Sequence, residues 1–416
     1  MYYFFGIILK DTKTCIGAEI MPSYVINKYR GLYKRAYELY EEKKYKEALE
    51  LLEVVVSKDE SNYEANYYLA EIYFYGKEVP KNEKRAFACY LYAAEGHLKE
   101  AIYMVAVCYF KGIGVYKDYT QAFNYFTEAI KYGVPMAEYY LGYMNKYGLS
   151  VEPPDKPRAL MWFLKAANNQ IPEAQKEAGM CYEELNDYFS AATLYLAGAK
   201  NNEPYCMEKI ADYYAEGKYV DKAVDIAIAF YNKASALGSK TADVKLAMIY
   251  EDSSFINDNE AKAVSLYIAA AKDGNAIAAN NLANCYYEGK GIDQDKYFAY
   301  TWWCKAANGG SIDAMVSLAK FLSEPPVSQV EKDLITAKFW WMKASEAGNS
   351  YAMYRLGRCF ERGLGVSDIS FKDAYKWYKL SAQNGCKEAQ KALKRYKKHL
   401  FGGVKIKSFS NENDAE

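Results

Sequence analysis

The stretch that decides the fold is residues 352–385, which read AMYRLGRCFERGLGVSDISFKDAYKWYKLSAQNG. Its first half has a small residue followed at +4 by an aliphatic, at +5 by a small and at +8 by an aromatic residue: Ala352, Leu356, Gly357 and Phe360. Its second half has a small residue followed by two aromatics and a glycine: Ala374, Trp377, Tyr378 and Gly385. Spacings of three, four and eight residues lie on one face of a helix, so the stretch predicts two amphipathic helices.

The first half of this pattern begins ten times along the chain, at Ala65, Ala101, Ala137, Ala174, Cys206, Ala242, Ala278, Ala314, Ala352 and Ala389. Ala65 and Ala389 are 324 residues apart over nine intervals, which gives a mean period of 36 residues. The second half begins 15 residues before each next start, at Ala86, Ala122, Ala159, Ala191, Ala227, Ala263, Ala299, Ala337 and Ala374. A period of this length, kept nine times, predicts a repeat array of helical pairs.

The residue types at these positions have a physical reason. Paired helices approach closely only where side chains are small, and the aromatic residues between them fill the remaining volume. Glycines follow both helices of most repeats, where a left-handed C-terminal cap favours glycine. We therefore expect each period to be a helix-turn-helix unit.

These residues resemble the Sel-1-like repeat, a member of the tetratricopeptide superfamily. The residues that carry the likeness best are Ala352, Leu356-Gly357, Gly363-Leu364-Gly365-Val366, Asp373-Ala374 and Trp377-Tyr378. The resemblance implies an all-α fold, an α/α superhelical solenoid of stacked helix-turn-helix repeats, with nine Sel-1-like repeats at 62–388. In the fourth repeat the residues 183–187 replace the glycine loop, so we expect the tightest turn there. The loops with Pro153-Pro154 and Pro325-Pro326 are expected to be long and exposed.

The ends of the chain depart from this pattern. Residues 1–26 form an N-terminal extension that is expected to hold two short strands around Asp11-Thr12-Lys13. Residues 27–61 fit a tetratricopeptide-like repeat. Residues 389–400 are expected to form a capping helix with lysines near its C-terminus, where cations favour the helix dipole, and residues 401–416 a disordered tail.

Charge and residue usage narrow the classes of function. The 53 basic and 53 acidic residues leave no net charge, which argues against a dedicated nucleic-acid binder. The two histidines, His97 and His399, cannot supply a multi-histidine metal site, and their scarcity argues against imidazole catalysis. The nine cysteines show no recurring paired spacing, so we expect reduced thiols, no metal and no cofactor.

No targeting or membrane-spanning segment is expected. The apolar residues 2–9 follow no basic region and are cut short by Lys10 and Asp11. No other stretch approaches the roughly 18–20 apolar residues that a membrane helix needs. Together with reduced thiols, this predicts a cytoplasmic protein, with secretion through a non-standard signal as the alternative.

The resemblance implies binding as the activity. Stacked helical pairs form a superhelix with a large concave surface, and Sel-1-like proteins act mostly as adaptors or scaffolds for macromolecular assembly. We therefore predict a non-enzymatic scaffold that binds a segment of another protein or peptide. Two alternatives stay open: a secreted bacterial effector that binds host proteins, and a β-lactam-binding or hydrolysing enzyme similar to cysteine-rich Sel-1-like proteins. The chain lacks the regular cysteine pairs of those proteins.

In this superfamily the concave wall is made mainly by the first helices, and a helical projection places positions −1, +2, +6 and +9 there. Tyr67, Tyr103 and Tyr139 then share one column. Rigid aromatic rings give contact area at low entropic cost, as interface hot spots do. The competing interpretation is that these rings pack against a neighbouring helix. The candidate partner-binding residues are Tyr67, Glu71, Phe74, Tyr103, Val107, Phe110, Tyr139, Tyr143, Lys146 and Tyr354.

Other recurring residues are interpreted as structural. The tryptophans Trp302, Trp340 and Trp377 are expected to pack in second helices, and the cysteines at +7 to share a semi-buried niche. Gly112-x-Gly114 and Gly363-x-Gly365 follow a helix, so they lack the strand-to-helix context of a nucleotide-binding fingerprint.

Overall fold

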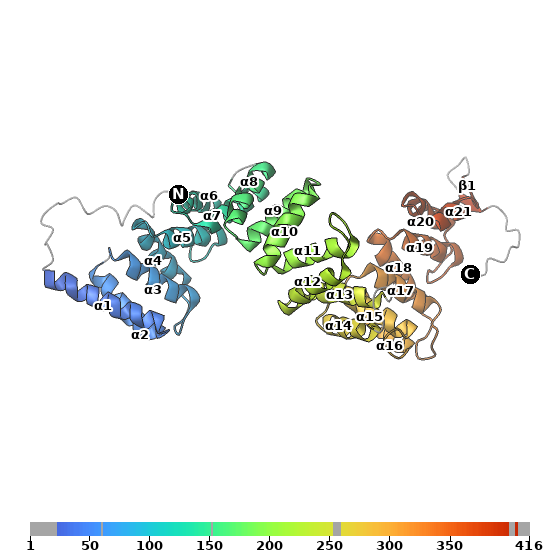
Figure 1. Ribbon diagram of the computed structural model, residues 1–416. Coiled ribbons are helices and arrows are strands. Elements are labelled where there is room, and N and C mark those ends of the chain that lie inside the picture. Colours follow the sequence, from blue (N-terminus) through green and yellow to red (C-terminus); the bar gives the residue numbers. More distant parts are fainter. Residues whose placement is uncertain (1–22, 60, 151–152, 253–258, 399–403, 407–416) are drawn as a thin grey trace. The chain divides into compact units, whose positions relative to one another are not determined.

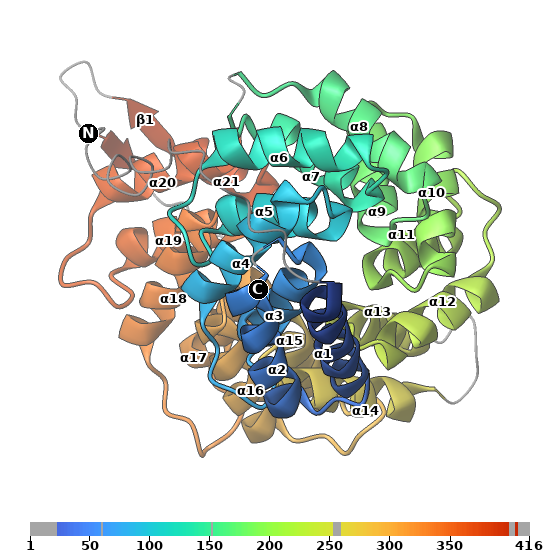
Figure 2. The same cartoon turned by 90° about the vertical axis from the view of Figure 1, so that its left-hand side faces the viewer.

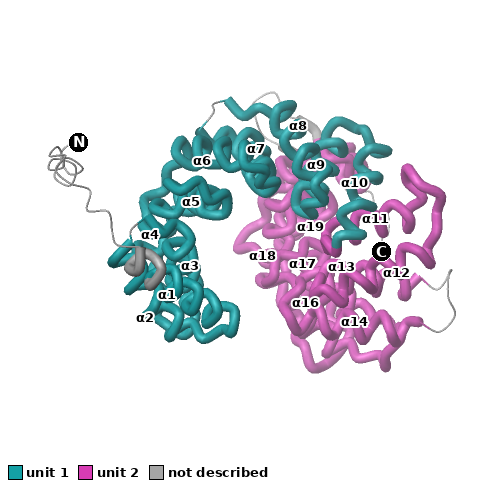
Figure 3. Tube along the Cα trace, turned by 60° about the vertical axis from the view of Figure 1, so that its left-hand side comes forward, with its two compact units in different colours: residues 1–201 teal, residues 202–416 magenta. Residues whose placement is uncertain are grey.

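The computed structural model describes residues 23–59, 61–150, 153–252, 259–398 and 404–406. The two strands expected around Asp11-Thr12-Lys13 and the tail expected at 407–416 lie outside these residues. The chain divides into two units, residues 1–201 and 202–416 (Figure 3), and each is described by itself. None of the helices in the described part of the chain combines the length and hydropathy that crossing a bilayer requires.

In the first unit the described residues form ten helices, and each helix packs beside the one before it (Figure 1). These are α1 (Ser23–Glu41), α2 (Tyr45–Lys58), α3 (Tyr63–Tyr75), α4 (Glu83–Glu95), α5 (Lys99–Lys111), α6 (Tyr119–Lys131), α7 (Pro135–Tyr147), α8 (Lys156–Asn168), α9 (Pro172–Glu184) and α10 (Tyr188–Lys200). The pair α1 and α2 lies at the segment 27–61 assigned to the tetratricopeptide-like repeat, but α1 begins at Ser23, within the residues assigned to the N-terminal extension.

Within the second unit, each helix again packs beside the one before it, and its helices are also labelled in Figure 2. Its helices are α11 (Pro204–Glu216), α12 (Val224–Ala236), α13 (Lys240–Glu251), α14 (Glu260–Lys272), α15 (Ala276–Glu288), α16 (Lys296–Asn308), α17 (Ile312–Ser323), α18 (Leu334–Glu346), α19 (Ser350–Arg362), α20 (Phe371–Gln383) and α21 (Lys387–Leu393). Two short strands, β1 (Tyr396–Lys398) and β2 (Val404–Ile406), pair antiparallel, with Tyr396 opposite Ile406. The all-α solenoid of paired helices is thus confirmed in each unit.

The helices begin where the repeat pattern predicts. Every first helix of a period starts two residues before its small residue, and every second helix starts three residues before its own. Polar caps fix several of these starts: the side chain of Asn62 accepts a hydrogen bond from the backbone N–H of Ala65, and that of Asn349 accepts one from Ala352. The small residues that mark the pattern are at most 2% exposed, so they lie where the helices cross.

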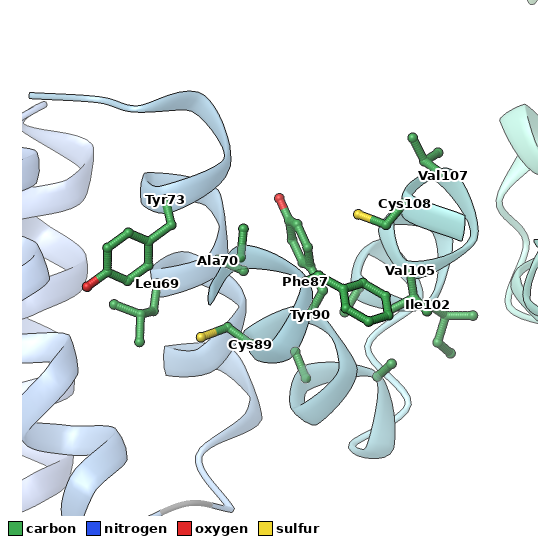
Figure 4. Packing of buried hydrophobic residues seen from close by; sticks show 14 of the residues in the cluster. Leu69, Ala70, Tyr73, Phe87, Cys89, Tyr90, Ile102, Val105, Val107 and Cys108 are labelled. Atoms are coloured by element: carbon green, nitrogen blue, oxygen red, sulfur yellow. The ribbon is translucent and has the colours of Figure 1, made fainter. Parts of the chain in front are cut away.

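The core of each repeat is an aromatic ring at position +4 of the second helix. All nine repeats have an aromatic residue there, and each one is buried: Tyr90, Phe126, Phe163, Tyr195, Tyr231, Tyr267, Trp303, Trp341 and Tyr378. Figure 4 shows Tyr90 of α4 in the cluster that also holds Ala70 of α3 and Val105 of α5.

This ring explains the small residue at +5 of the first helix. A Cβ added to Gly142, Gly179 or Gly357 would lie only 2.5–2.7 Å from the ring of Phe163, Tyr195 or Tyr378, respectively. The ring therefore fills the space that a larger side chain would need, and only Ala or Gly occurs at +5.

The second glycine of the Gly-x-Gly loops serves contact between repeats. A Cβ on Gly114 would lie 2.1 Å from the backbone oxygen of Glu83, the first residue of α4 in the preceding repeat. Gly365 stands in the same relation to Leu334, the first residue of α18. Both glycines also have positive φ angles. Glycine is therefore favoured at these positions for two reasons, the left-handed backbone and the lack of space for a Cβ.

Two of the three loops singled out from the sequence have the expected length. The third, residues 148–155 with Pro153-Pro154, is no longer than residues 252–259 or 363–370. Within the nine repeats, the three residues 185–187 between α9 and α10 make the shortest connection, and residues 324–333 between α17 and α18 make the longest. The short turn is possible because Asn186 takes a positive φ of 60° in place of the missing glycine.

The expected capping helix at 389–400 is wrong in its extent. α21 ends at Leu393, and β1 begins at Tyr396. The hydroxyl of Tyr396 donates a hydrogen bond to Oε1 of the buried Glu361 at 2.9 Å, and its ring lies 5.8 Å from that of Tyr378. Because this contact places Tyr396 against α20, the chain leaves the helix before 399, and a hairpin instead of a full helix covers the end of the stack.

Tyrosine hydroxyls in this core pair with carboxylates of the first helix of the same repeat. Tyr90 donates to Glu71 at 2.5 Å, Tyr267 to Glu251 at 2.8 Å and Tyr378 to Glu361 at 2.7 Å. Burial, together with the adjacent carboxylate, raises the pKa of each of these hydroxyls above its ordinary value. The two helices of a repeat are thereby joined by a protonated tyrosine.

We predict that replacing Gly357 by Ala destabilises the fold. The added methyl group would collide with the Tyr378 ring, and overpacking of this kind costs roughly 1–3 kcal/mol. Gly31→Ala in α1 is the matched control, because nothing lies within 4 Å of its Cβ position and Ala favours a helix by up to about 1 kcal/mol. Thermal unfolding should show a lower Tm for Gly357→Ala and an equal or higher Tm for Gly31→Ala. Equal losses in both variants would contradict the packing role of the ring.

We also predict that stability falls at alkaline pH. A raised pKa in the folded state contributes stability below the unfolded value near pH 10, and this is lost as the pH rises and unfolded tyrosines ionise. Tyr378→Phe should flatten the decline in unfolding free energy by up to about 1.4 kcal/mol per pH unit. Tyr116→Phe, at a residue that is 94% exposed, should leave the slope unchanged. Urea unfolding measured between about pH 9 and about pH 11 gives both slopes.

Candidate functional site

The tyrosine column on the first helices lies at the edge of the core. Tyr67, Tyr103, Tyr139 and Tyr354 are all partly buried. Each ring lies 5.7–6.1 Å from the +4 ring of its own repeat, which is Tyr90, Phe126, Phe163 and Tyr378 in that order. The structure therefore gives the four residues one equivalent environment, in which one part of the ring packs and another remains accessible.

The candidates at +6 and +9 in the first repeat also contact the core. Glu71 accepts the hydrogen bond from Tyr90, and Phe74 lies 5.9 Å from the same ring. In the next two repeats, Phe110 lies 6.0 Å from Tyr143. Val107 is 5% exposed, so it belongs to the core and not to an accessible wall.

Lys146 is held by an ion pair between successive first helices. Its Nζ lies 2.8 Å from Oε2 of Glu177 on α9, and the two side chains are 12% and 11% exposed. Burial alone would lower the pKa of Lys146, but the hydrogen bond and charge of Glu177 raise it. The lysine thus links two repeats, and its charge is already compensated within the unit.

A pocket rich in tyrosine lies in the first unit. Its volume is about 470 Å³, and it is lined by residues of α1, α3 and the start of α5: Tyr33, Tyr37, Tyr40, Glu64, Tyr67, Tyr68, Leu98 and Glu100. Three of these residues stand at positions that the helical projection places on the concave wall. Glu64 and Glu100 are at position −1 of their repeats, and Tyr67 is at +2.

The rings of this tyrosine pocket support one another. Tyr68 lies 5.2 Å from Tyr37 and 4.9 Å from Tyr40. Burial, and then the Glu64 carboxylate, raises the pKa of Tyr33, so its hydroxyl stays protonated. The repeat pattern did not indicate the contribution of α1, although Tyr33, Tyr37 and Tyr40 stand at a helical spacing of four and three.

A larger cavity lies in the second unit, against the first helices α15, α17 and α19 and the second helix α18. Its volume is about 810 Å³. Position +6 of three successive repeats lines it, through Asn284, Lys320 and Arg358. The cations Arg355 and Arg362 line it as well. The sequence signal that could have found this cluster is the spacing of Arg355, Arg358 and Arg362, which places all three on one face of a helix.

The cysteine side chains are placed for packing and not for reactivity. Burial raises the pKa of the Cys89 and Cys359 thiols to about 11 and that of Cys108 and Cys285 to about 12. None of the eight cysteines that the structure describes forms a disulfide. Within the same part of the chain, no group of three or more His, Cys, Asp or Glu side chains is placed to hold a metal ion.

Comparison with known families gives a match over most of the repeat array. The Sel1 repeat matches residues 64–97, 99–133, 135–170, 204–239, 241–275, 276–311, 312–349 and 350–386. These are eight of the nine expected repeats. The remaining one contains α9 and α10, where the short turn replaces the glycine loop.

Two curated relatives are proteins of Saccharomyces cerevisiae. Protein SHC1 is 29% identical over 181 residues, which make up 42% of this chain and 30% of that protein. The chitin synthase regulator SKT5 is 27% identical over 193 residues, which make up 43% of this chain and 28% of that protein. The matched part is thus less than a third of the length of either relative.

Solved structures extend the likeness to most of the chain. The protective antigen c5321 of uropathogenic Escherichia coli, which displays an SLR fold, is 28% identical with a TM-score of 0.69, over 83% of this chain and 73% of that one. A Sel1 repeat protein from Oxalobacter formigenes is 26% identical with a TM-score of 0.53, over 58% of this chain and 96% of that one. Since the repeat matches more than half of the sequence, and the helical pairs begin where its period places them, the chain belongs to the Sel1 repeat family.

Proposed function

We propose that this chain is a non-enzymatic scaffold or adaptor of the cytoplasm, which holds a segment of a partner protein against the first helices of its solenoid. The observation that carries the proposal is the tyrosine pocket on α1, α3 and α5, where five tyrosines and two glutamates surround about 470 Å³. A concave aromatic surface with a few polar groups is the usual composition of a site for protein segments.

The packing of these tyrosines favours binding. Tyr67 is braced by Tyr90 and by Tyr68, with ring centroids 6.1 and 5.4 Å apart. A ring fixed before the partner arrives loses little conformational entropy on binding, so more of its contact energy becomes affinity. Tyrosine is also among the residues most enriched in interface hot spots.

The relatives support a role toward other proteins. One yeast relative is described as a chitin synthase regulator, and the regulator of an enzyme is a protein that acts on another protein. We carry over only this kind of role, since the chain spans 28% of that relative.

The chemistry favours binding over the β-lactam alternative. Hydrolysis by a thiol needs a thiolate at neutral pH, and the raised pKa values of Cys89, Cys108, Cys285 and Cys359 keep these groups protonated. The secreted-effector alternative differs from the scaffold proposal only in where the protein acts, and the binding surface would be the same in both.

The test uses the tagged full chain to capture partners from cell lysate, mass spectrometry to identify them, and a purified partner to measure Kd. We predict that Tyr67→Ala weakens binding by roughly 1–3 kcal/mol, because Tyr67 lines the tyrosine pocket. Tyr103→Ala is the matched control: it packs on the +4 ring of its repeat as Tyr67 does, but it does not line the tyrosine pocket.

Both variants should lose similar stability, since both remove a ring from the same environment. Only Tyr67→Ala should lose affinity once the folded fraction is taken into account. If both variants kept the affinity of the unchanged chain, the column would be packing and the partner would bind elsewhere. Equal losses of affinity would mean that the partner contacts the whole column and not the tyrosine pocket alone. Failure of the full chain to capture any protein would contradict the scaffold role itself.

A further inference from the structure

We infer that the cavity on α15, α17 and α19 binds an acidic, extended segment of a partner protein, and this inference rests on the proposed function. Five cationic side chains line this basic cavity: Lys320, Lys332, Arg355, Arg358 and Arg362. Two carboxylates line it as well, Glu288 and Glu324. The excess of positive charge is local, because the whole chain has no net charge.

The five cations have no ion-pair partner among the residues that the structure describes. On two other first helices, a cation is compensated by a carboxylate of a neighbouring repeat. Lys245 on α13 lies 2.6 Å from Asp212 on α11, and Lys146 on α7 lies 2.8 Å from Glu177 on α9. The basic cavity departs from this arrangement, since its cations have no such carboxylate in the described part of the chain.

The departure is clearest at one pair of repeat positions. Asp212 stands at +6 of its repeat and Lys245 at +3 of the next, which gives opposite charges. In the eighth and ninth repeats the same two positions hold Lys320 and Arg355, which are like charges. Like charges at equivalent neighbouring positions repel, and an anion placed between them relieves the repulsion.

One aromatic residue holds these two cations in place. The Nζ atom of Lys320 lies 4.9 Å from the ring centroid of Tyr351, and Nη1 of Arg355 donates a hydrogen bond to the hydroxyl of Tyr351 at 3.1 Å. The guanidinium of Arg355 also lies 4.8 Å over the ring of the buried Trp341. A guanidinium fixed in this way presents its remaining N–H groups as a rigid fork that fits a carboxylate.

The shape of the basic cavity favours a polypeptide. Its lining spans three successive first helices, so an occupant that reaches all of them is extended. The partly buried Tyr287 and Leu364 line the cavity together with the cations and suit apolar side chains that alternate with acidic ones. A nucleic acid would instead be favoured by a basic stripe on a basic domain, and this chain has equal numbers of acidic and basic residues.

The test measures binding of the full chain to a fluorescein-labelled synthetic peptide of about ten residues that alternates Glu and Phe, a length set by the rise of about 3.3 Å per residue of extended chain. Fluorescence anisotropy gives Kd. We expect a peptide with Gln in place of Glu to bind roughly tenfold more weakly or worse, and affinity for the Glu peptide to fall as salt rises from about 0.05 to about 0.3 M.

Arg358→Glu should weaken binding of the Glu peptide by at least roughly tenfold, since it reverses a charge that no described residue compensates. Arg158→Glu on α8 is the matched control, because Arg158 is an exposed arginine of the other unit, and it should leave Kd unchanged. Arg358→Lys keeps the charge and should retain most of the affinity. Circular dichroism of each variant checks that its helices are intact.

Equal binding of the Glu and Gln peptides, or the same loss in Arg358→Glu and Arg158→Glu, would overturn the inference. So would an RNA oligonucleotide of equal length that binds through Arg358 more tightly than the peptide. These results would leave the scaffold role in place if Tyr67→Ala still weakens binding of the captured partner. Loss of the scaffold role would show instead as absence of any captured protein.

Discussion

The contact between a buried aromatic ring at +4 of each second helix and a small residue at +5 of the first helix is the constraint on which the rest of the structure depends. The ring fills the space between the two helices so closely that a Cβ at Gly142, Gly179 or Gly357 would overlap it. Because every repeat keeps this contact, each helical pair has the same geometry, and the next pair can dock on it at a fixed period. Tyrosine at +4 adds a hydroxyl that joins the first helix through a carboxylate, as in Tyr90 with Glu71.

The binding surfaces follow from the same arrangement. Since the +4 ring fills the interior, the +2 ring beside it is held at the edge of the core, partly packed and partly accessible, as Tyr67 is. Side chains at positions +6 and +9 of the first helices then either bind another residue of the solenoid, as Glu71 does, or remain available to a partner, as Arg358 does. The two concave sites therefore differ in charge, with glutamates in the tyrosine pocket and arginines in the basic cavity, although the backbone that carries them is repeated.

Part of the candidate site was predictable from the spacing of residues along the chain. The rest depends on contacts between helices, which the spacing does not give. The column of Tyr67, Tyr103 and Tyr139 was found from spacing, since equivalent positions of a repeat have equivalent environments. Which member lines a pocket was not predictable, because Tyr67 gains its neighbours from α1, a helix outside the Sel1 pattern. Lys146 was likewise a candidate partner-binding residue, and its pairing with Glu177, 31 residues away, could not be predicted from the spacing.

The sequence by itself determined the helices, their starting residues and their pairing, because a period of 36 residues with small residues at fixed offsets admits one local packing. It also indicated that the fourth repeat has the tightest turn, at residues 183–187. Only the tertiary structure decided how the array ends and where its charges are left without partners. Tyr396 turns the chain into a hairpin because its hydroxyl reaches Glu361, 35 residues earlier. Lys320 and Arg355 become an uncompensated pair because neighbouring repeats bring +6 and +3 positions together, a relation between residues that are distant in the chain.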